Sequence, residues 1–134
     1  MKNAAAEAYK RQQVLTATPE ALTLMLYNGC VKFMDEGIKA LRADKPNYEQ
    51  ANISLQKAQN IISEFRVTLD MQYDISKQLL PLYNYTYDRL VEANMKSDPT
   101  KIEEAKSIIT DLRDAWMQAM KKARAEKGPA GRYA

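Results

Sequence analysis

The sequence predicts an all-α protein, an antiparallel up-down-up-down four-helix bundle preceded by a short N-terminal leader. Glycine and proline are scarce, with four and five residues among 134, so few turns interrupt the chain. Apolar residues recur at intervals of three and four positions along four long segments, which is the spacing of an amphipathic helix. Short connections separate these segments, and they require successive helices to run antiparallel.

The predicted leader comprises residues 1–17, and we expect it to be mobile. Its run of alanines favours helix, but a piece of this length is marginal alone. Two interpretations remain open. The leader is either a frayed end or a small arm that docks reversibly on exposed apolar surface.

The first long helix is predicted from Pro19 to about Ala43, with Thr18 as its N-cap. It carries two apolar stripes whose centres lie about 130° apart around the helix. One stripe consists of Leu24, Tyr27, Val31, Met34, Ile38 and Leu41, and the other of Leu22, Leu26, Gly29, Phe33, Gly37 and Ala40. A helix of a small bundle needs one apolar face. The sequence does not decide which stripe faces inward, and the second is available for another contact.

Three further helices complete the bundle, which we expect to span residues 18–127. They are predicted at about Tyr48–Leu69, Ile75–Lys96 and Pro99–Glu126. Pro81 must either kink the third of these segments or divide it. The predicted core stripe of that segment consists of Ile75, Leu79, Leu82, Thr86, Leu90 and Ala93. Gly128 should end the last helix, leaving residues 128–134 as a disordered tail.

The amino-acid composition argues against a metal site, a cofactor site or a catalytic site. Histidine is absent, which excludes the di-iron and haem sites that other helical bundles hold. The single Cys30 predicts a small buried thiol, and no phosphate-binding or metal-binding spacing occurs. We therefore expect neither an enzyme nor a cofactor. A net charge of +3 without a basic stripe argues against nucleic acid. No signal peptide or membrane span is apparent, which predicts a cytoplasmic protein without membrane insertion.

Several short motifs follow one another through the chain in a fixed order. They are Thr16-Ala17-Thr18-Pro19-Glu20, Leu26-Tyr27-Asn28-Gly29, Lys32-Phe33, Asn52, Lys57-Ala58, Ile61-Ile62, Leu69-Asp70, Leu82-Tyr83-Asn84-Tyr85, Arg89-Leu90, Ala93-Asn94 and Leu112-Arg113-Asp114-Ala115-Trp116. Their order and spacing over residues 9–120 resemble the flagellar secretion chaperones of the FliS family. The sequence departs from the family pattern at Asn28, Cys30 and Pro81.

The resemblance implies an export chaperone that binds the C-terminal segment of flagellin, which becomes helical on the chaperone. Binding would prevent premature polymerisation and assist type III flagellar export, with export-gate and other flagellar proteins as further partners. It also implies that the leader covers part of the flagellin site and moves aside. We expect a monomer or weak dimer. The alternative is a structural homo-oligomeric helical-bundle subunit that uses the second apolar stripe for self-association.

The predicted partner-binding residues are apolar side chains outside the inferred core. Tyr9 would anchor the leader arm, and the second apolar stripe of the first long helix supplies three more residues. Each of these residues could instead be ordinary core. The full set is Tyr9, Leu22, Leu26, Phe33, Ile53, Ile61, Leu80, Tyr87 and Val91.

Overall fold

A computed structural model describes residues 4–131 of the chain and, within them, the side chains up to Glu126. These residues form helices and short connections, without a strand. The helices are α1 (Ala4–Thr16), α2 (Pro19–Arg42), α3 (Tyr48–Thr68), α4 (Asp74–Lys96) and α5 (Pro99–Gly131). The predicted all-α fold is confirmed.

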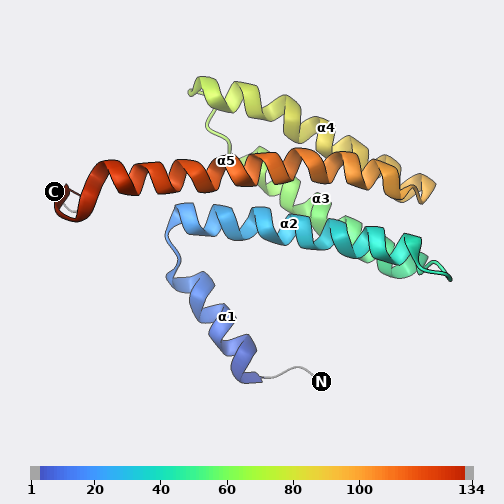
Figure 1. The fold of residues 1–134 in the computed structure, drawn as a ribbon. Coiled ribbons are helices and arrows are strands. Elements are labelled where there is room, and N and C mark those ends of the chain that lie inside the picture. Colours follow the sequence, from blue (N-terminus) through green and yellow to red (C-terminus); the bar gives the residue numbers. More distant parts are fainter. Residues whose placement is uncertain (1–3, 132–134) are drawn as a thin grey trace.

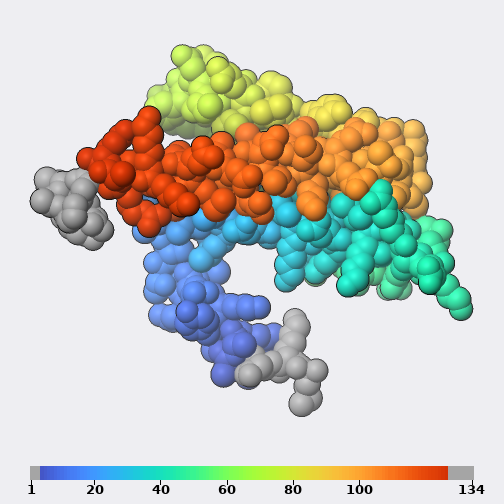
Figure 2. Space-filling view, viewed as in Figure 1, coloured from blue at the N-terminus to red at the C-terminus, as the bar shows by residue number. Residues whose placement is uncertain are grey.

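Helices α2 to α5 form the bundle, and α1 lies outside it (Figure 1). Each bundle helix packs against its neighbours along the chain, and α5 closes the ring against α2. No residue of α1 is buried. In the space-filling view, α1 stands apart from the bundle (Figure 2). Residues 4–16 of the leader are therefore helical, residues 1–3 lie outside the described residues, and the mobility of the leader stays a prediction.

Side chains cap the first two bundle helices, α2 at the predicted Thr18 and α3 at Asn47. The Thr18 hydroxyl accepts a hydrogen bond from the Ala21 N–H at 3.1 Å, at the start of α2. Asn47 does the same for the Gln50 N–H at 3.0 Å, at the start of α3. Such caps satisfy donors that the first helical turn leaves without partners. These local signals explain why helix starts were predictable from the sequence.

A left-handed residue makes the turn between α4 and α5. Ser97 has a φ of 52°, a conformation that commonly ends helices. The Asp98 N–H then donates to the Ala93 carbonyl at 3.1 Å. The Asp98 carboxylate accepts from the Thr100 N–H at 3.0 Å, so a two-residue connection both ends α4 and begins α5.

The core decides which stripe of α2 faces inward. Tyr27 and Met34 of the first stripe are buried along the length of the bundle, whereas Leu22 and Leu26 of the second are not. The second stripe is buried only toward the end of α2. There Gly37 permits a close approach, since a Cβ at this position would lie 3.1 Å from Leu55 Cδ2. The buried apolar residues of α3 recur at three- and four-residue intervals, and they are Ala51, Leu55, Ala58, Ile62 and Phe65.

The predicted core stripe of α4 is wrong at two positions, whereas Leu79 between them packs against the core. Ile75 and Leu82 are 58% and 39% exposed, whereas Tyr83 is buried. Leu82 and Tyr83 are adjacent, and either one fits the three- and four-residue spacing between Leu79 and Thr86, so periodicity alone could not choose between them. The choice is set by contacts across the core, because the Tyr83 hydroxyl lies 2.6 Å from the Tyr27 hydroxyl of α2.

Two helix-breaking residues have weaker effects than the sequence suggested. Pro81 does not divide α4, which is continuous from Asp74 to Lys96. Pro81 lies on an exposed side of α4, where water can hydrogen-bond the carbonyl that a proline leaves unpaired. Similarly, α5 continues to Gly131, beyond its predicted end near Glu126. The last residues of the predicted disordered tail, 132–134, lie outside the described residues.

Three aromatic rings pack together toward one end of the core, near the start of α2 and the end of α3. The Phe65 ring lies between Tyr27 and Tyr83, with centroid distances of 4.6 and 5.3 Å. Burial raises the pKa of both tyrosines above the usual value of 10.0. Burial also raises the pKa of the Cys30 thiol from 9.0 to about 12. All three groups therefore keep their protons more strongly in the folded state than in the unfolded state.

These pKa shifts predict a loss of stability at alkaline pH. The unfolded chain releases the Cys30 proton near pH 9.0 and the tyrosine protons near pH 10.0, whereas the folded chain retains them. Stability is then fully present below about pH 9 and falls as the pH rises toward the folded values. Thermal melting between about pH 8 and 11 should show this fall. A Tyr27→Phe/Tyr83→Phe double variant should lose less stability above pH 10; an unchanged slope would contradict the assignment to this pair.

Candidate partner-binding surface

Acidic and basic side chains bridge the helices on both sides of α5. Toward α2, Arg42 pairs with Glu103 at 2.6 Å, and Lys106 pairs with Asp35 at 2.6 Å. The Glu103 hydrogen bond raises the pKa of Arg42, and Arg42 in turn lowers the pKa of Glu103. Among the described residues, no group of histidine, cysteine, aspartate and glutamate could hold a metal ion. The carboxylates here act as structural links between helices.

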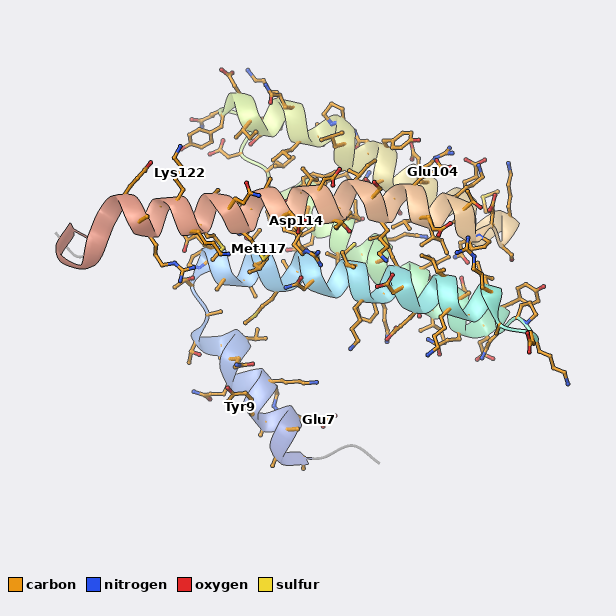
Figure 3. All side chains as sticks on the ribbon, viewed as in Figure 1. Glu7, Tyr9, Glu104, Asp114, Met117 and Lys122 are labelled. Carbon is orange, nitrogen blue, oxygen red and sulfur yellow. The ribbon has the colours of Figure 1, made fainter. Side chains whose placement is uncertain are left out.

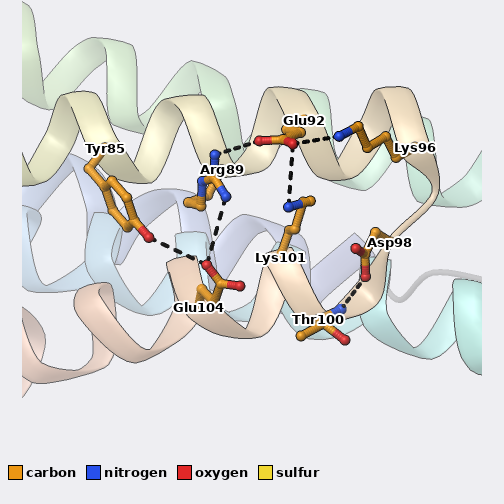
Figure 4. A network of polar contacts seen from close by, with 8 residues as sticks. All are labelled: Tyr85, Arg89, Glu92, Lys96, Asp98, Thr100, Lys101 and Glu104. Atoms are coloured by element: carbon orange, nitrogen blue, oxygen red, sulfur yellow. Dashed lines mark hydrogen bonds and ion pairs between the residues drawn. The ribbon is translucent and has the colours of Figure 1, made fainter.

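A second polar network joins α5 to α4 (Figure 4). Glu92 accepts from Lys96 at 2.8 Å and pairs with Lys101 of α5 at 3.3 Å. The hydrogen bond from Lys96 is the largest cause that lowers the pKa of Glu92, to about 2. A hydrogen bond from Lys101 and the positive charges of Arg89 and Lys101 act in the same direction. Glu104 of α5 accepts from the Tyr85 hydroxyl at 3.4 Å. Ion pairs thus cover the outer surface where α4 meets α5.

Helix α3 differs from its neighbours in this respect. Among the described residues, no ion pair joins α3 to α2 or to α4. Apolar contacts, cation–π contacts and hydrogen bonds occupy the outer surface on either side of α3, including a bond of 3.3 Å from the Ser54 hydroxyl to the Glu36 carboxylate of α2. These two surfaces contain seven of the nine predicted partner-binding residues, and we describe each in turn.

The α2–α3 seam is the outer surface between those helices, formed by Leu22, Leu26, Gly29 and Phe33 with Lys57 and Ile61. A Cβ at Gly29 would lie 3.6 Å from Ile61 Cδ1, which places the second stripe of α2 directly beside α3. The Lys57 ammonium lies 5.4 Å from the centre of the Phe33 ring. Leu22 remains 38% exposed. Four predicted site residues therefore come together here: Leu22, Leu26, Phe33 and Ile61.

The α3–α4 seam is formed by Leu80, Asn84, Tyr87, Val91 and Asn94 of α4 with Asn52 and Arg66 of α3. The α4 residues recur at four- and three-residue intervals, so they share one face. Arg66 lies over the Tyr87 ring at 4.2 Å and donates to Asn84 at 3.3 Å. Asn94 donates to Asn52 at 2.8 Å. Sequence reasoning placed Leu80, Tyr87 and Val91 among the site residues but missed the polar ones. Asn84 and Asn94 lie three positions before and seven positions after Tyr87, and this helical spacing could have placed them on the same face.

The two remaining predicted residues lie apart from these seams. Ile53 is on the outer side of α3, away from the core. Tyr9 is 65% exposed on α1, and its hydroxyl accepts a hydrogen bond from Gln13 at 3.1 Å. Figure 3 shows Tyr9 on the detached helix, away from the bundle. The leader therefore covers neither seam in this structure.

Comparison with known proteins identifies the family. A family model described as "Flagellar protein FliS" matches residues 1–123. The chain belongs to the FliS family. The flagellar secretion chaperone FliS of Bacillus subtilis is 44% identical over 124 residues, which is 92% of each chain. The FliS of Escherichia coli is 30% identical over 110 residues, covering 80% of this chain and 79% of its own.

A solved structure shares the helical fold of this chain. It is described as the crystal structure of a flagellar chaperone from bacteria and superposes with a TM-score of 0.70. The match covers 88% of this chain and 98% of that chain, at 20% sequence identity. The FliS resemblance inferred from the motifs is thus confirmed, and the protein is a flagellar chaperone of helical fold. Among the described residues of this FliS family member, no helix is long and apolar enough to cross a membrane.

Proposed function

We propose that this protein is a cytoplasmic export chaperone that binds the C-terminal segment of flagellin. One observation supports this most directly. Helix α2 buries one apolar stripe in the core and still presents Leu22, Leu26 and Phe33 beside Ile61 of α3. An apolar surface of helical spacing between two helices suits an amphipathic helix that docks into a groove. Membership of the FliS family supports the choice of a flagellar client.

The physical role follows from the client's own surfaces. A flagellin tail carries apolar stripes for its neighbours in the filament, and these would associate prematurely if left uncovered. Covering them on the chaperone keeps the subunit available for delivery to the type III export gate. Folding a disordered segment on binding costs about 2–5 kcal/mol of the gross interaction. That cost keeps a long contact releasable.

The leader suits a regulatory role at this surface. Tyr9, Val14 and Leu15 are exposed on α1, and a two-residue connection joins α1 to α2. An arm of this kind can cover the adjacent end of the α2–α3 seam and move aside when a client binds. The position of α1 away from the bundle leaves the seam accessible (Figure 1).

A peptide titration tests the proposed function. Mixing the protein with the C-terminal flagellin segment of its own organism should give more helix, by circular dichroism, than the sum of the separate components. Phe33→Asp should raise Kd at least about tenfold, because it places a charge in the apolar contact. Ile75→Asp is the matched control, since Ile75 is an exposed apolar residue outside both seams.

Two outcomes would contradict the proposal. One is a helical signal equal to the sum of the components. The other is an obligate dimer, observed by sedimentation at all concentrations and abolished by Phe33→Asp. That result would favour the structural homo-oligomer, in which the second stripe of α2 binds another copy of the chain.

A further inference from the structure

A cavity of about 200 Å³ opens at the end of the bundle remote from α1. It lies where α2 ends, α3 begins and α4 ends. Leu41, Leu55 and Ala93 form an apolar floor, and Tyr48, Asn52 and Asn94 contribute to the rim. The floor residues belong to the core and are buried. The cavity is therefore lined mainly by residues of three bundle helices, with Ser97 contributed by the α4–α5 connection.

The lining of the cavity indicates what it could hold. None of its residues is charged, so an apolar group matches it better than an ion does. An engineered apolar cavity of about 150 Å³ in another protein accommodates benzene. A volume of about 200 Å³ is therefore sufficient for one large aliphatic or aromatic side chain.

The rim provides hydrogen-bonding groups of defined orientation. Asn94 donates through Nδ2 to Asn52 Oδ1 at 2.8 Å, which holds the two amide groups beside each other. Gln56 also donates to Asn52 Oδ1, at 3.3 Å. Asn94 Oδ1 and the Asn52 amino group have no further protein partner among the described residues. An acceptor and a donor side by side match the N–H and C=O groups of a peptide main chain.

We propose that this cavity is an anchor pocket for one large apolar side chain of the flagellin C-terminal segment. Asn52 and Asn94 would hydrogen-bond the main chain beside that side chain. The inference rests on the proposed function and adds the site at which the client is held. Its placement supports this occupant, because Asn94 is the last residue of the α4 face that forms the α3–α4 seam. A segment lying in that seam leads directly into the cavity.

The leader is a poor candidate for the same site. Helix α2 has 24 residues and is about 36 Å long, whereas the 13 residues of α1 span about 20 Å. The leader joins α2 at its first turn, and the cavity lies beside Leu41 at the other end. As a helix, the leader can therefore cover the near end of the α2–α3 seam but not the cavity. The anchor pocket stays open in either position of the leader.

Titration calorimetry with the flagellin C-terminal peptide tests the pocket. Asn94→Asp removes the donor to Asn52 and adds a charge at the rim, and Ala93→Met fills the floor. Each should raise Kd at least tenfold. The matched control is Asn28→Asp, the same chemical change on the α2–α5 side, where Asn28 accepts a hydrogen bond from Arg113 at 3.4 Å. Its Kd should stay within twofold of wild type.

The outcomes separate this inference from the proposed function. If the wild-type protein does not bind the peptide, both are overturned. If the wild type binds and Asn94→Asp also binds within twofold of it, the anchor pocket is overturned while the proposed function stands. Thermal melts establish that each variant is folded. Should Ala93→Met prevent folding, Asn94→Asp alone decides, because Asn94 is only partly buried.

Discussion

An Ile62→Ala variant is expected to lose about 2–5 kcal/mol of unfolding free energy. Ile62 is fully buried in the middle of α3, and α3 packs against both α2 and α4. Removing its outer carbons forfeits apolar burial and leaves a cavity that the surrounding helices fill only partly. Urea denaturation followed by circular dichroism measures the change. A midpoint lowered at an unchanged slope would show that the variant loses stability and keeps its fold.

A second position on the same helix provides the control. Val67 is 80% exposed, and its replacement by alanine should change the unfolding free energy by less than about 0.5 kcal/mol. Equal losses at Ile62 and Val67 would contradict the assignment of the inward face of α3. They would also undermine both seams, which lie on either side of that face.

A Tyr83→Phe variant is expected to lose about 1–3 kcal/mol of unfolding free energy, because it leaves a buried hydrogen-bonding group without its partner. The Tyr83 hydroxyl is the hydrogen-bond partner of the Tyr27 hydroxyl at 2.6 Å inside the core. Removing it leaves the buried Tyr27 hydroxyl without that partner. The Tyr27→Phe/Tyr83→Phe double variant removes both groups, so it should lose less than the sum of the two single variants. A double-mutant cycle by thermal or urea unfolding measures the coupling, and additive losses would show that the hydroxyls do not depend on each other.

This tyrosine pair also shows where prediction from sequence reached its limit. Helix starts were predictable because their signals are local, as Thr18 illustrates by accepting from a residue three positions ahead. The sequence did not reveal which face of α4 turns inward. That choice depends on the contact between Tyr83 and Tyr27, which are 56 positions apart in the chain. Periodicity states that a helix has an apolar face, but tertiary contacts select among faces that differ by one residue.

The candidate site was predictable to a similar degree. The second stripe of α2 was apparent as surplus apolar surface, and the structure places Leu22, Leu26 and Phe33 of that stripe on the α2–α3 seam. The sequence could not show that this stripe becomes part of the core toward the end of α2. Gly37 and Ala40 continue the same spacing, but they are buried. The Asn52–Asn94 pair escaped site prediction because amides on two different helices reveal their relation only after folding. Whether these residues bind a partner stays a prediction.

Among the described residues no ion pair joins α3 to α2 or α4, and this has a consequence for how binding depends on salt concentration. Dissolved ions screen exposed charge pairs, and at 1 M salt the screening distance shrinks to about 3 Å. The links from α5 to α2 and α4 are of that kind, whereas contacts made at the α3 surfaces are not. A chaperone built in this way would not lose its apolar contacts to a client as ionic strength rises, whereas the exposed ion pairs of α5 would weaken.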